Sequence, residues 1–439
     1  MKSLYNLILI VAIASPLLSQ QSDPSQSSGT EWDRTPAPLA GQGVRRMPLD
    51  ERATANYVTG GIAFTQMYTD NAELSNNGQI SDLSYNIEPH IALNHFSPRL
   101  SYDAAVTAGF VVNRKLDDRN QATQDGSLDL SYHLSQFVVL RLTDSFRNTT
   151  GLWTGPASST TSPGAGAGPI QEPNRSLLTY GQFRANTALA ELSAQLSPAS
   201  YAGIRGEQTH TWFPSAATDP VVGPLYGGDT YSAETFYNHR FSLRNWAGIT
   251  LRAQRFDLDQ SLSRTDSGTL LFMYAVTIRP SKTLSFFGGP RLSVTSAASA
   301  ITPASGFQRR MWSPDAGVVF NSETRTTTGT VSYTHGVSDG GGLISAVTLD
   351  SADAEVSRRL GRRFEIGPGF TYSSSVPIVS GTTIRTYSGR VESTVRLRNC
   401  SFSLGYSRDD RTDVGSNVGA TANRVWVSFS YDFIRPIGR

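Results

Sequence analysis

The sequence has a single cysteine, Cys400, among its 439 residues. One cysteine excludes a disulfide framework and a thiolate metal site. Lysine and arginine number 38 against 36 aspartate and glutamate, so the net charge gives no indication that nucleic acid is a partner. Charged residues make up only 17% of the chain, which is below the average of soluble globular proteins. The composition therefore points away from a typical soluble domain.

Most short motifs of common enzyme classes are also missing. There is no HExxH, Walker-type or H-x-S-N-G segment, and G-x-S-x-G occurs once, as GVSDG at 336–340. His335 lies close to Ser338 and Asp339 in THGVSDGGG, but adjacent loop residues cannot supply the separated base and nucleophile of a catalytic triad. We therefore expect a protein that is not an enzyme and that uses no metal or cofactor.

Apolar runs are short throughout the chain. Lys2 is followed by twelve largely apolar residues at 7–18, fewer than the roughly 20 that a transmembrane helix needs. This pattern predicts a secretory signal peptide at residues 1–20. The polar segment 21–55, rich in Ser, Pro and Gly, predicts a flexible periplasmic leader. The remainder, 56–439, is expected to fold as one domain.

What the chain does contain is aromatic and β-branched residues in a period of two. Leu128, Leu130, Tyr132 and Leu134 alternate with polar residues, and so do the apolar residues of 425–433. Side chains on a strand point alternately to opposite faces, so each such segment has one apolar and one polar face. The alternation predicts about 18 strands, with 16 as the alternative. They are expected to start near residues 56, 83, 100, 126, 137, 175, 201, 226, 246, 268, 283, 308, 325, 346, 363, 384, 400 and 421.

The connections between these strands alternate between short and long. Tight turns are expected at 97–100, 134–137, 197–200, 243–246, 279–282, 321–324, 359–362 and 398–401, with longer loops between them. Outer-membrane barrels have this asymmetry, with short periplasmic turns and long external loops. A lipid-facing sheet must close on itself to pair every backbone group. The sequence thus predicts an all-β, up-and-down, antiparallel transmembrane barrel in the bacterial outer membrane.

Aromatic residues near the strand ends are expected to form girdles at the membrane interfaces. They include Tyr57, Phe64, Tyr68, Phe96, Tyr102, Phe137, Trp153, Tyr201, Trp246, Phe286 and Tyr372. The last strand, 424–433, resembles the aromatic-ended final strand of outer-membrane proteins. That resemblance implies recognition by the outer-membrane assembly machinery. Two departures are Ser428, where that pattern usually has glycine, and the residues that follow Phe433.

Barrels of 16–18 strands leave an aqueous channel, which makes a pore the simplest expectation. The polar faces supply candidate pore-lining residues: Glu88, Asp103, Asp129, Arg141, Glu191, Arg252, Arg291, Glu392, Arg396, Arg398 and Arg424. Rings of charge tune the selectivity of such pores. Arg396, Arg398 and Arg424 could form a basic wall that favours anions. Alternatively, the inward charges pair across strands and only solvate the lumen.

The longest loop, 148–174, connects the fifth and sixth expected strands. In this respect the chain resembles the general porins, and the resemblance implies a loop that folds into the barrel and narrows it. The composition GPASSTTSPGAGAGP, with Glu172 as the only acid, instead favours an exposed loop. We expect a porin-like channel for small hydrophilic solutes or ions, surrounded by outer-membrane lipid and free to form oligomers. The alternative is a barrel without an open pore, for polysaccharide export or for surface binding.

Overall fold

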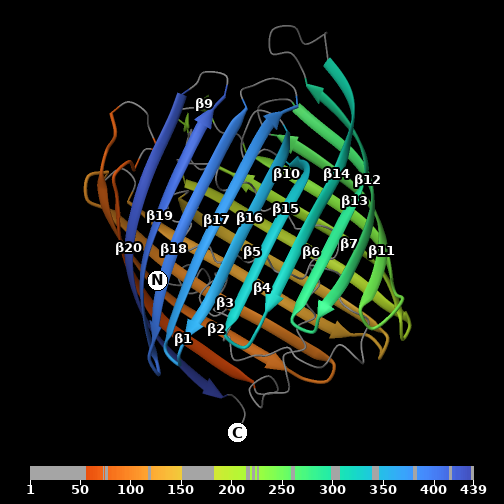
Figure 1. Cartoon of the computed structure of the whole chain (residues 1–439), viewed down its shortest axis with the longest axis horizontal. Helices are drawn as coiled ribbons and strands as arrows, with labels where there is room; N and C mark the ends of the chain where they lie inside the picture. Colours follow the sequence, from red (N-terminus) through yellow and green to blue (C-terminus); the bar gives the residue numbers. More distant parts are fainter. Residues whose placement is uncertain are drawn as a thin grey trace, which may run out of the picture.

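The computed structural model describes residues 56–436 except 73, 75–77, 117–119, 151–181, 214–217, 220–222, 225–226, 259–262, 298–306, 339–345, 379–382 and 415–417. The signal peptide, the leader and most of the longest loop therefore lie outside the described residues. Figure 1 shows a single barrel of tilted strands. No helix in the described part of the chain is long and apolar enough to cross a membrane.

Strands make up nearly all of the described chain. Their bounds are β1 Tyr57–Thr69, β2 Asp82–Phe96, β3 Leu100–Asn113, β4 Gln121–His133, β5 Val138–Thr150, β6 Gln182–Ser197, β7 Ser200–Trp212, β8 Thr218–Asp219, β9 Gly223–Pro224, β10 Gly228–Arg240, β11 Asn245–Leu258, β12 Ser263–Arg279, β13 Lys282–Ala297, β14 Phe307–Glu323, β15 Thr327–Ser338, β16 Val347–Leu360, β17 Phe364–Pro377, β18 Ile384–Arg396, β19 Cys400–Asp413 and β20 Val418–Pro436.

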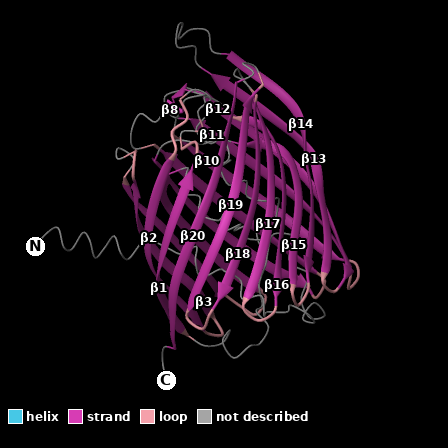
Figure 2. Cartoon of the chain, turned by 60° about the vertical axis from the view of Figure 1, so that its left-hand side comes forward, coloured by secondary structure: helices cyan, strands magenta, loops and turns pink. Residues whose placement is uncertain are grey.

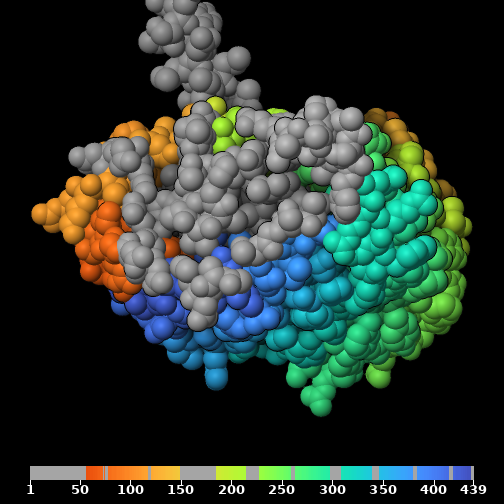
Figure 3. Space-filling model, turned by 90° about the horizontal axis from the view of Figure 1, so that it is seen from above, coloured from red at the N-terminus to blue at the C-terminus, as the bar shows by residue number. Residues whose placement is uncertain are grey.

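Eighteen of these strands form one closed antiparallel sheet, and β8 and β9 form a small separate pair. Each strand of the barrel pairs with its neighbours in the sequence, and β20 closes the circle on β1 from Tyr57↔Pro436 to Thr69↔Arg424. Figure 2 shows this closure from the side, and in Figure 3 the chain colours follow one another around the rim. The prediction of an 18-stranded up-and-down barrel is confirmed.

The outer face of the barrel is apolar because the period-two pattern holds across the sheet. On β20, Val425, Val427, Phe429, Tyr431 and Phe433 are exposed outside, and the alternate residues face the lumen. On the inner side, hydroxyl groups link adjacent strands, as between Thr65 and Ser428 at 2.8 Å. The wall therefore presents hydrocarbon to its surroundings and polar groups to its interior.

The two ends of the barrel differ in the length of their connections. At one end the strands are joined by turns of two to four residues: 97–99, 134–137, 198–199, 241–244, 280–281, 324–326, 361–363 and 397–399. Four of these turns share one device, in which a Ser or Thr hydroxyl at 97, 135, 242 or 324 accepts the amide N–H three residues later. β1 begins and β20 ends at this short-turn end, as Figure 1 shows.

The wall is interrupted between β14 and β15. Their register runs from Glu323↔Thr328 only as far as Ala316↔His335, whereas β15 stays paired with β16 up to Ser338↔Val347. Beyond His335, Val337 packs with Phe256 of β11 and with Ala346, Ile378 and Met311. We call Gly336–Ser338, Ala346 and Ile378 the inward-folded segment, because it lies over the inner faces of strands between β11 and β14.

Candidate functional site: the inner face of the barrel

Most of the charged residues singled out from the sequence lie on strand positions that alternate with the exposed outer hydrophobic residues. This holds for Glu88, Asp103, Asp129, Arg141, Glu191, Arg252, Arg291, Glu392, Arg396 and Arg424. Arg398 is different, because β18 ends at Arg396 and Arg398 is exposed in the turn 397–399. Arg398 therefore belongs to the short-turn end of the barrel and not to its wall.

One row of charges crosses seven neighbouring strands from β5 to β13. On each of these strands one residue is paired in direct register with the next. The charges of the first five alternate between positive and negative, a threonine follows, and the last is an arginine. In order they are Arg141, Glu191, Arg205, Glu234, Arg252, Thr269 and Arg291. We call this row the alternating-charge band. Cross-strand neighbours of opposite charge stabilise a sheet, so the pattern fits the register that the strands adopt.

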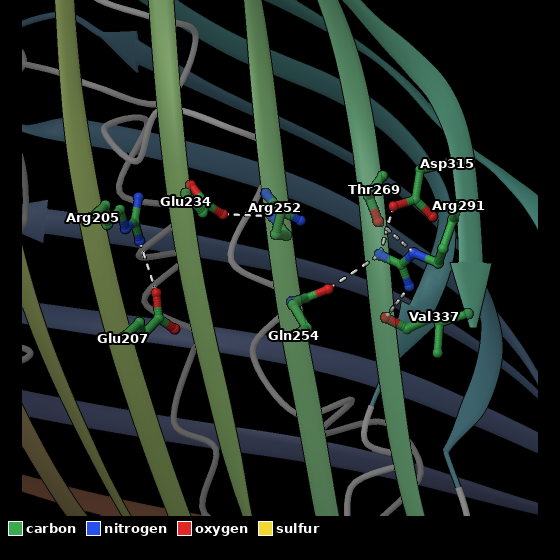
Figure 4. A network of polar contacts seen from close by, with 9 residues as sticks. All are labelled: Arg205, Glu207, Glu234, Arg252, Gln254, Thr269, Arg291, Asp315 and Val337. Atoms are coloured by element: carbon green, nitrogen blue, oxygen red, sulfur yellow. Dashed lines mark hydrogen bonds and ion pairs between the residues drawn. The ribbon is translucent and has the colours of Figure 1, made fainter. Parts of the chain in front are cut away.

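Arg291 is the centre of the polar network at one end of this band, drawn in Figure 4. Its side chain is only 2% exposed and forms an ion pair with Asp315 at 2.5 Å. It also donates hydrogen bonds to Thr269 at 3.0 Å, to Gln254 at 3.2 Å and to the backbone carbonyl of Val337 at 3.1 Å. The last bond ties the wall of the barrel to the inward-folded segment.

A second bond of the same kind lies nearer the long-loop end. Arg309 of β14 donates to the backbone carbonyl of Ile378 at 2.7 Å, across 69 residues of sequence. The amide of Ile378 in turn donates to the carbonyl of Ala346 at 3.0 Å. Two arginines of the wall thus hold the ends of β15 and β17 against the inside of the barrel, where they narrow the lumen.

Eight arginines of the inner face are neutralised by carboxylates. The pairs are Arg141–Asp129, Arg147–Asp125, Arg205–Glu207, Arg252–Glu234, Arg291–Asp315, Arg390–Glu355, Arg396–Glu365 and Arg424–Asp409. Several of these pairs are almost fully buried, which requires each charge to have a partner because an isolated buried ion is strongly unfavourable.

The proposed basic wall does not form. Arg396 pairs with Glu365 at 3.1 Å and Arg424 pairs with Asp409 at 2.8 Å, while Arg398 lies in the turn. A carboxylate next to each of the two strand arginines removes the excess of positive charge that the sequence suggested.

Four inner carboxylates have no ion-pair partner in the part of the chain that the structure describes. They are Glu88, Asp103, Asp353 and Glu392, and they are bonded instead to neutral groups. Asn86 is hydrogen-bonded to Glu88 and Asn94 to Asp103, and hydroxyl groups are hydrogen-bonded to Asp353 and Glu392. The described inner wall therefore contains eight arginine–carboxylate pairs and, besides them, four carboxylates that are bonded to neutral groups.

Comparison with known proteins gives a likeness of structure only. No family model matches the sequence, and no curated protein matches it. Among solved structures, OccAB3 of Acinetobacter baumannii is 8% identical, with a TM-score of 0.45 over 87% of this chain and 99% of that one. The outer membrane protein opdK of Pseudomonas aeruginosa is 9% identical, with a TM-score of 0.41 over 86% and 99%. Such remote likenesses transfer no functional property to this chain.

Not all of the aromatic residues expected at the membrane interface lie on the outer face of the barrel. Trp246 is 7% exposed and packs with Phe236, Met273 and Ala275, with Tyr201 against the same cluster. Trp246 and Arg252 lie six residues apart on β11, so they share the inner face. Tyr68 and Tyr372 do lie on the outer face, and Trp153 is outside the described residues.

The surroundings of His335 do not form a catalytic triad. Its Nδ1 atom lies 2.8 Å from Asp350, and the hydroxyl of Tyr333 donates to the same carboxylate. Ser338 is three positions along the strand from His335, so the two side chains leave β15 on opposite faces. Among the described residues there is no cluster of three or more His, Cys, Asp or Glu that could hold a metal ion.

Sequence reasoning missed several inner residues, notably Arg205, Asp315, Asp353, Arg390 and Asp409. Most of them lie in a segment where small residues weaken the apolar alternation, such as Ala202 and Gly206 around Arg205, whereas Asp409 lies between the charged Arg408 and Asp410. Counting alternate positions from one residue known to face outward finds them. Ile204 is 59% exposed on the outer face, so the next residue, Arg205, points inward.

Proposed function

We propose that the protein is an outer-membrane channel for small hydrophilic solutes or ions. The observation that carries this proposal is a closed 18-stranded barrel with an apolar outer face and a charged inner face. Barrels of this size enclose an aqueous channel, and their apolar outer face is matched to lipid. The short turns, the start of β1 and the end of β20 would then face the periplasm.

We further propose that the channel prefers cations. Eight inner arginines have carboxylate partners, and the four further carboxylates Glu88, Asp103, Asp353 and Glu392 outnumber Arg309, the inner arginine that binds a backbone carbonyl. Rings of aspartate and glutamate favour cations in other pores. This preference is opposite to the one that a basic wall at Arg396 and Arg424 would have given.

A closed barrel used for export or surface binding is the second candidate. The inward-folded segment supports it, because Val337, Ala346 and Ile378 occupy space against the inner wall. In this case the lumen would conduct only when a partner or a substrate moves that segment.

Conductance of the refolded protein in a planar lipid bilayer tests the proposal. We expect discrete current steps, and in a KCl gradient a reversal potential with the sign of a cation-selective pore. Folding is checked by the change in gel mobility on heating. Silent but folded protein would favour the closed barrel, and a reversal potential of the opposite sign would contradict the cation preference.

A further inference from the structure

The two ends of the barrel carry opposite charge. The eight short turns contain six arginines and no lysine, aspartate or glutamate: Arg99, Arg244, Arg325, Arg362, Arg363 and Arg398. The connections at the other end contain eight acidic and four basic residues. The overall net charge of +2 conceals this polarity.

All six turn arginines are exposed, and more positive charge lies beside them. Arg279, Arg358 and Arg435 are exposed at the ends of β12, β16 and β20. Glu365, two residues after Arg363, is already engaged with Arg396 at 3.1 Å. Glu323, at the end of β14, is an exposed acid near Arg325, so the short-turn end is a rim with many more arginines than carboxylates.

Large apolar side chains are exposed next to these arginines. Phe241 and Leu243 are 67% and 65% exposed beside Arg244, and Leu397 is 56% exposed beside Arg398. Ile278 precedes Arg279, and Leu360 precedes Arg362, in the same way. A site for a soluble polyanion would not need exposed Phe and Leu. A membrane interface does, because apolar groups enter the hydrocarbon while basic groups stay at the headgroups.

The geometry of the turns keeps each arginine at one level. Because the turns have only two to four residues, their side chains stay close to the end of the apolar wall. The arginines follow an arc from the β10–β11 turn to the β2–β3 turn, and on this arc the turn 280–281 has no arginine of its own but follows Arg279. The turns after β4 and β6 have none. Their contacts would therefore lie along one continuous arc of the barrel edge.

We propose that this rim binds anionic phospholipid in the leaflet at the short-turn end. The guanidinium groups hold lipid phosphates, to which arginine donates paired hydrogen bonds. The apolar neighbours contact the first part of the acyl chains. The inference relies on the membrane placement argued under the proposed function, but it does not require that the barrel conduct.

The test measures lipid preference around the refolded barrel. The protein is reconstituted in phosphatidylcholine vesicles with a minor fraction of phosphatidylglycerol, and spin-labelled forms of the two lipids report their relative association. A basic residue at an anionic surface favours association by a factor of about five. We expect a preference of this order for phosphatidylglycerol in the native protein. The preference should be largely lost when all six turn arginines are changed to glutamine, and it should weaken in high salt.

The matched control changes six exposed arginines at the other end to glutamine: Arg114, Arg255, Arg264, Arg310, Arg385 and Arg408. Some of these already have partners. Burial raises the pKa of Asp266, but hydrogen bonds from Arg255 and Arg264 outweigh that effect and lower it. The control variant should therefore keep most of the lipid preference. All variants must show the gel mobility of the folded barrel.

Three results would overturn the proposal. They are no preference for phosphatidylglycerol in the native protein, an equal loss in both variants, and complete displacement by inorganic phosphate, which would indicate an anion site without a lipid. Conductance is measured separately on the same samples. A barrel that is silent yet prefers phosphatidylglycerol would refute the channel and leave the lipid rim intact.

Discussion

Two stretches of the inner wall differ in how their charged side chains are bonded. From β5 to β13, Arg141, Arg205, Arg252 and Arg291 are each paired with a carboxylate, and Arg291 is additionally covered by the inward-folded segment. On β2 and β3, Glu88 and Asp103 have no ion-pair partner in the described part of the chain and are bonded to Asn86 and Asn94. The first stretch resembles a protein core made of ion pairs, and the second resembles the wall of an aqueous channel.

This difference indicates a division of labour along the wall. Paired charges contribute little net potential, but removing one partner of a buried pair leaves the other uncompensated, which is strongly destabilising. Carboxylates without an ion-pair partner contribute potential to the lumen and little to the packing. Variants in the first stretch should therefore change stability and shape, and variants in the second should change selectivity.

The largest effect is expected from Arg291→Met. The change leaves Asp315 buried without its partner, which costs about 3–5 kcal/mol for pairs of this kind. It also removes the hydrogen bond to Val337 that holds the inward-folded segment. Denaturant titration of the refolded barrel should show the lost stability, and the channel should conduct more current per step.

A double variant separates these two consequences. Arg291→Met with Asp315→Leu leaves no uncompensated charge, so stability should return towards that of the native protein. The bond to Val337 is still absent, so the higher conductance should persist. If the double variant regains stability and conducts like the native barrel, the Arg291 bond does not hold the segment in the lumen.

A smaller loss of stability is expected within the alternating-charge band. Glu234→Gln removes the partner at 2.5 Å from Arg252 and should destabilise the barrel by about 3 kcal/mol. Changing Arg252 to Gln as well should recover a large part of that loss, because the two residues interact directly. Equal unfolding midpoints for the single and double variants would show that the two charges are not coupled.

The sequence predicted this barrel well where the outer face meets lipid. Expected strand starts at 100, 384 and 400 agree with β3, β18 and β19 to the residue. The starts expected at 126 and 268 are five residues late, because Gln121–Asp125 and Ser263–Ser267 continue the strands as mostly polar sequence. Beyond the lipid nothing requires an apolar outer face, so the alternation disappears while the hydrogen bonding continues.

The inner face was less predictable for a related reason. Parity along a strand indicates which side chains point inward, but not which of them meet across strands that are far apart in sequence. The contact of Arg291 with Val337 depends on the break in register after His335, which no local pattern signals. Likewise, Arg396 is paired with Glu365 and Arg424 with Asp409, and both carboxylates come from a neighbouring strand.

The smallest structural effect, and the sharpest test of the division between the two stretches, is expected from Glu88→Gln combined with Asp103→Asn. Neither carboxylate has an ion-pair partner among the described residues, so stability should change by no more than about 0.5 kcal/mol per site. The variant removes two carboxylates from the lumen, so the reversal potential in a KCl gradient should move towards zero.

The matched control is the pair Glu355→Gln with Arg390→Gln, which removes one charge of each sign at a 3.0 Å ion pair. It should leave the reversal potential unchanged. If the control shifts selectivity as much as the acidic pair does, paired and unpaired charges act alike on the ions, and the contrast between the two stretches has no functional meaning.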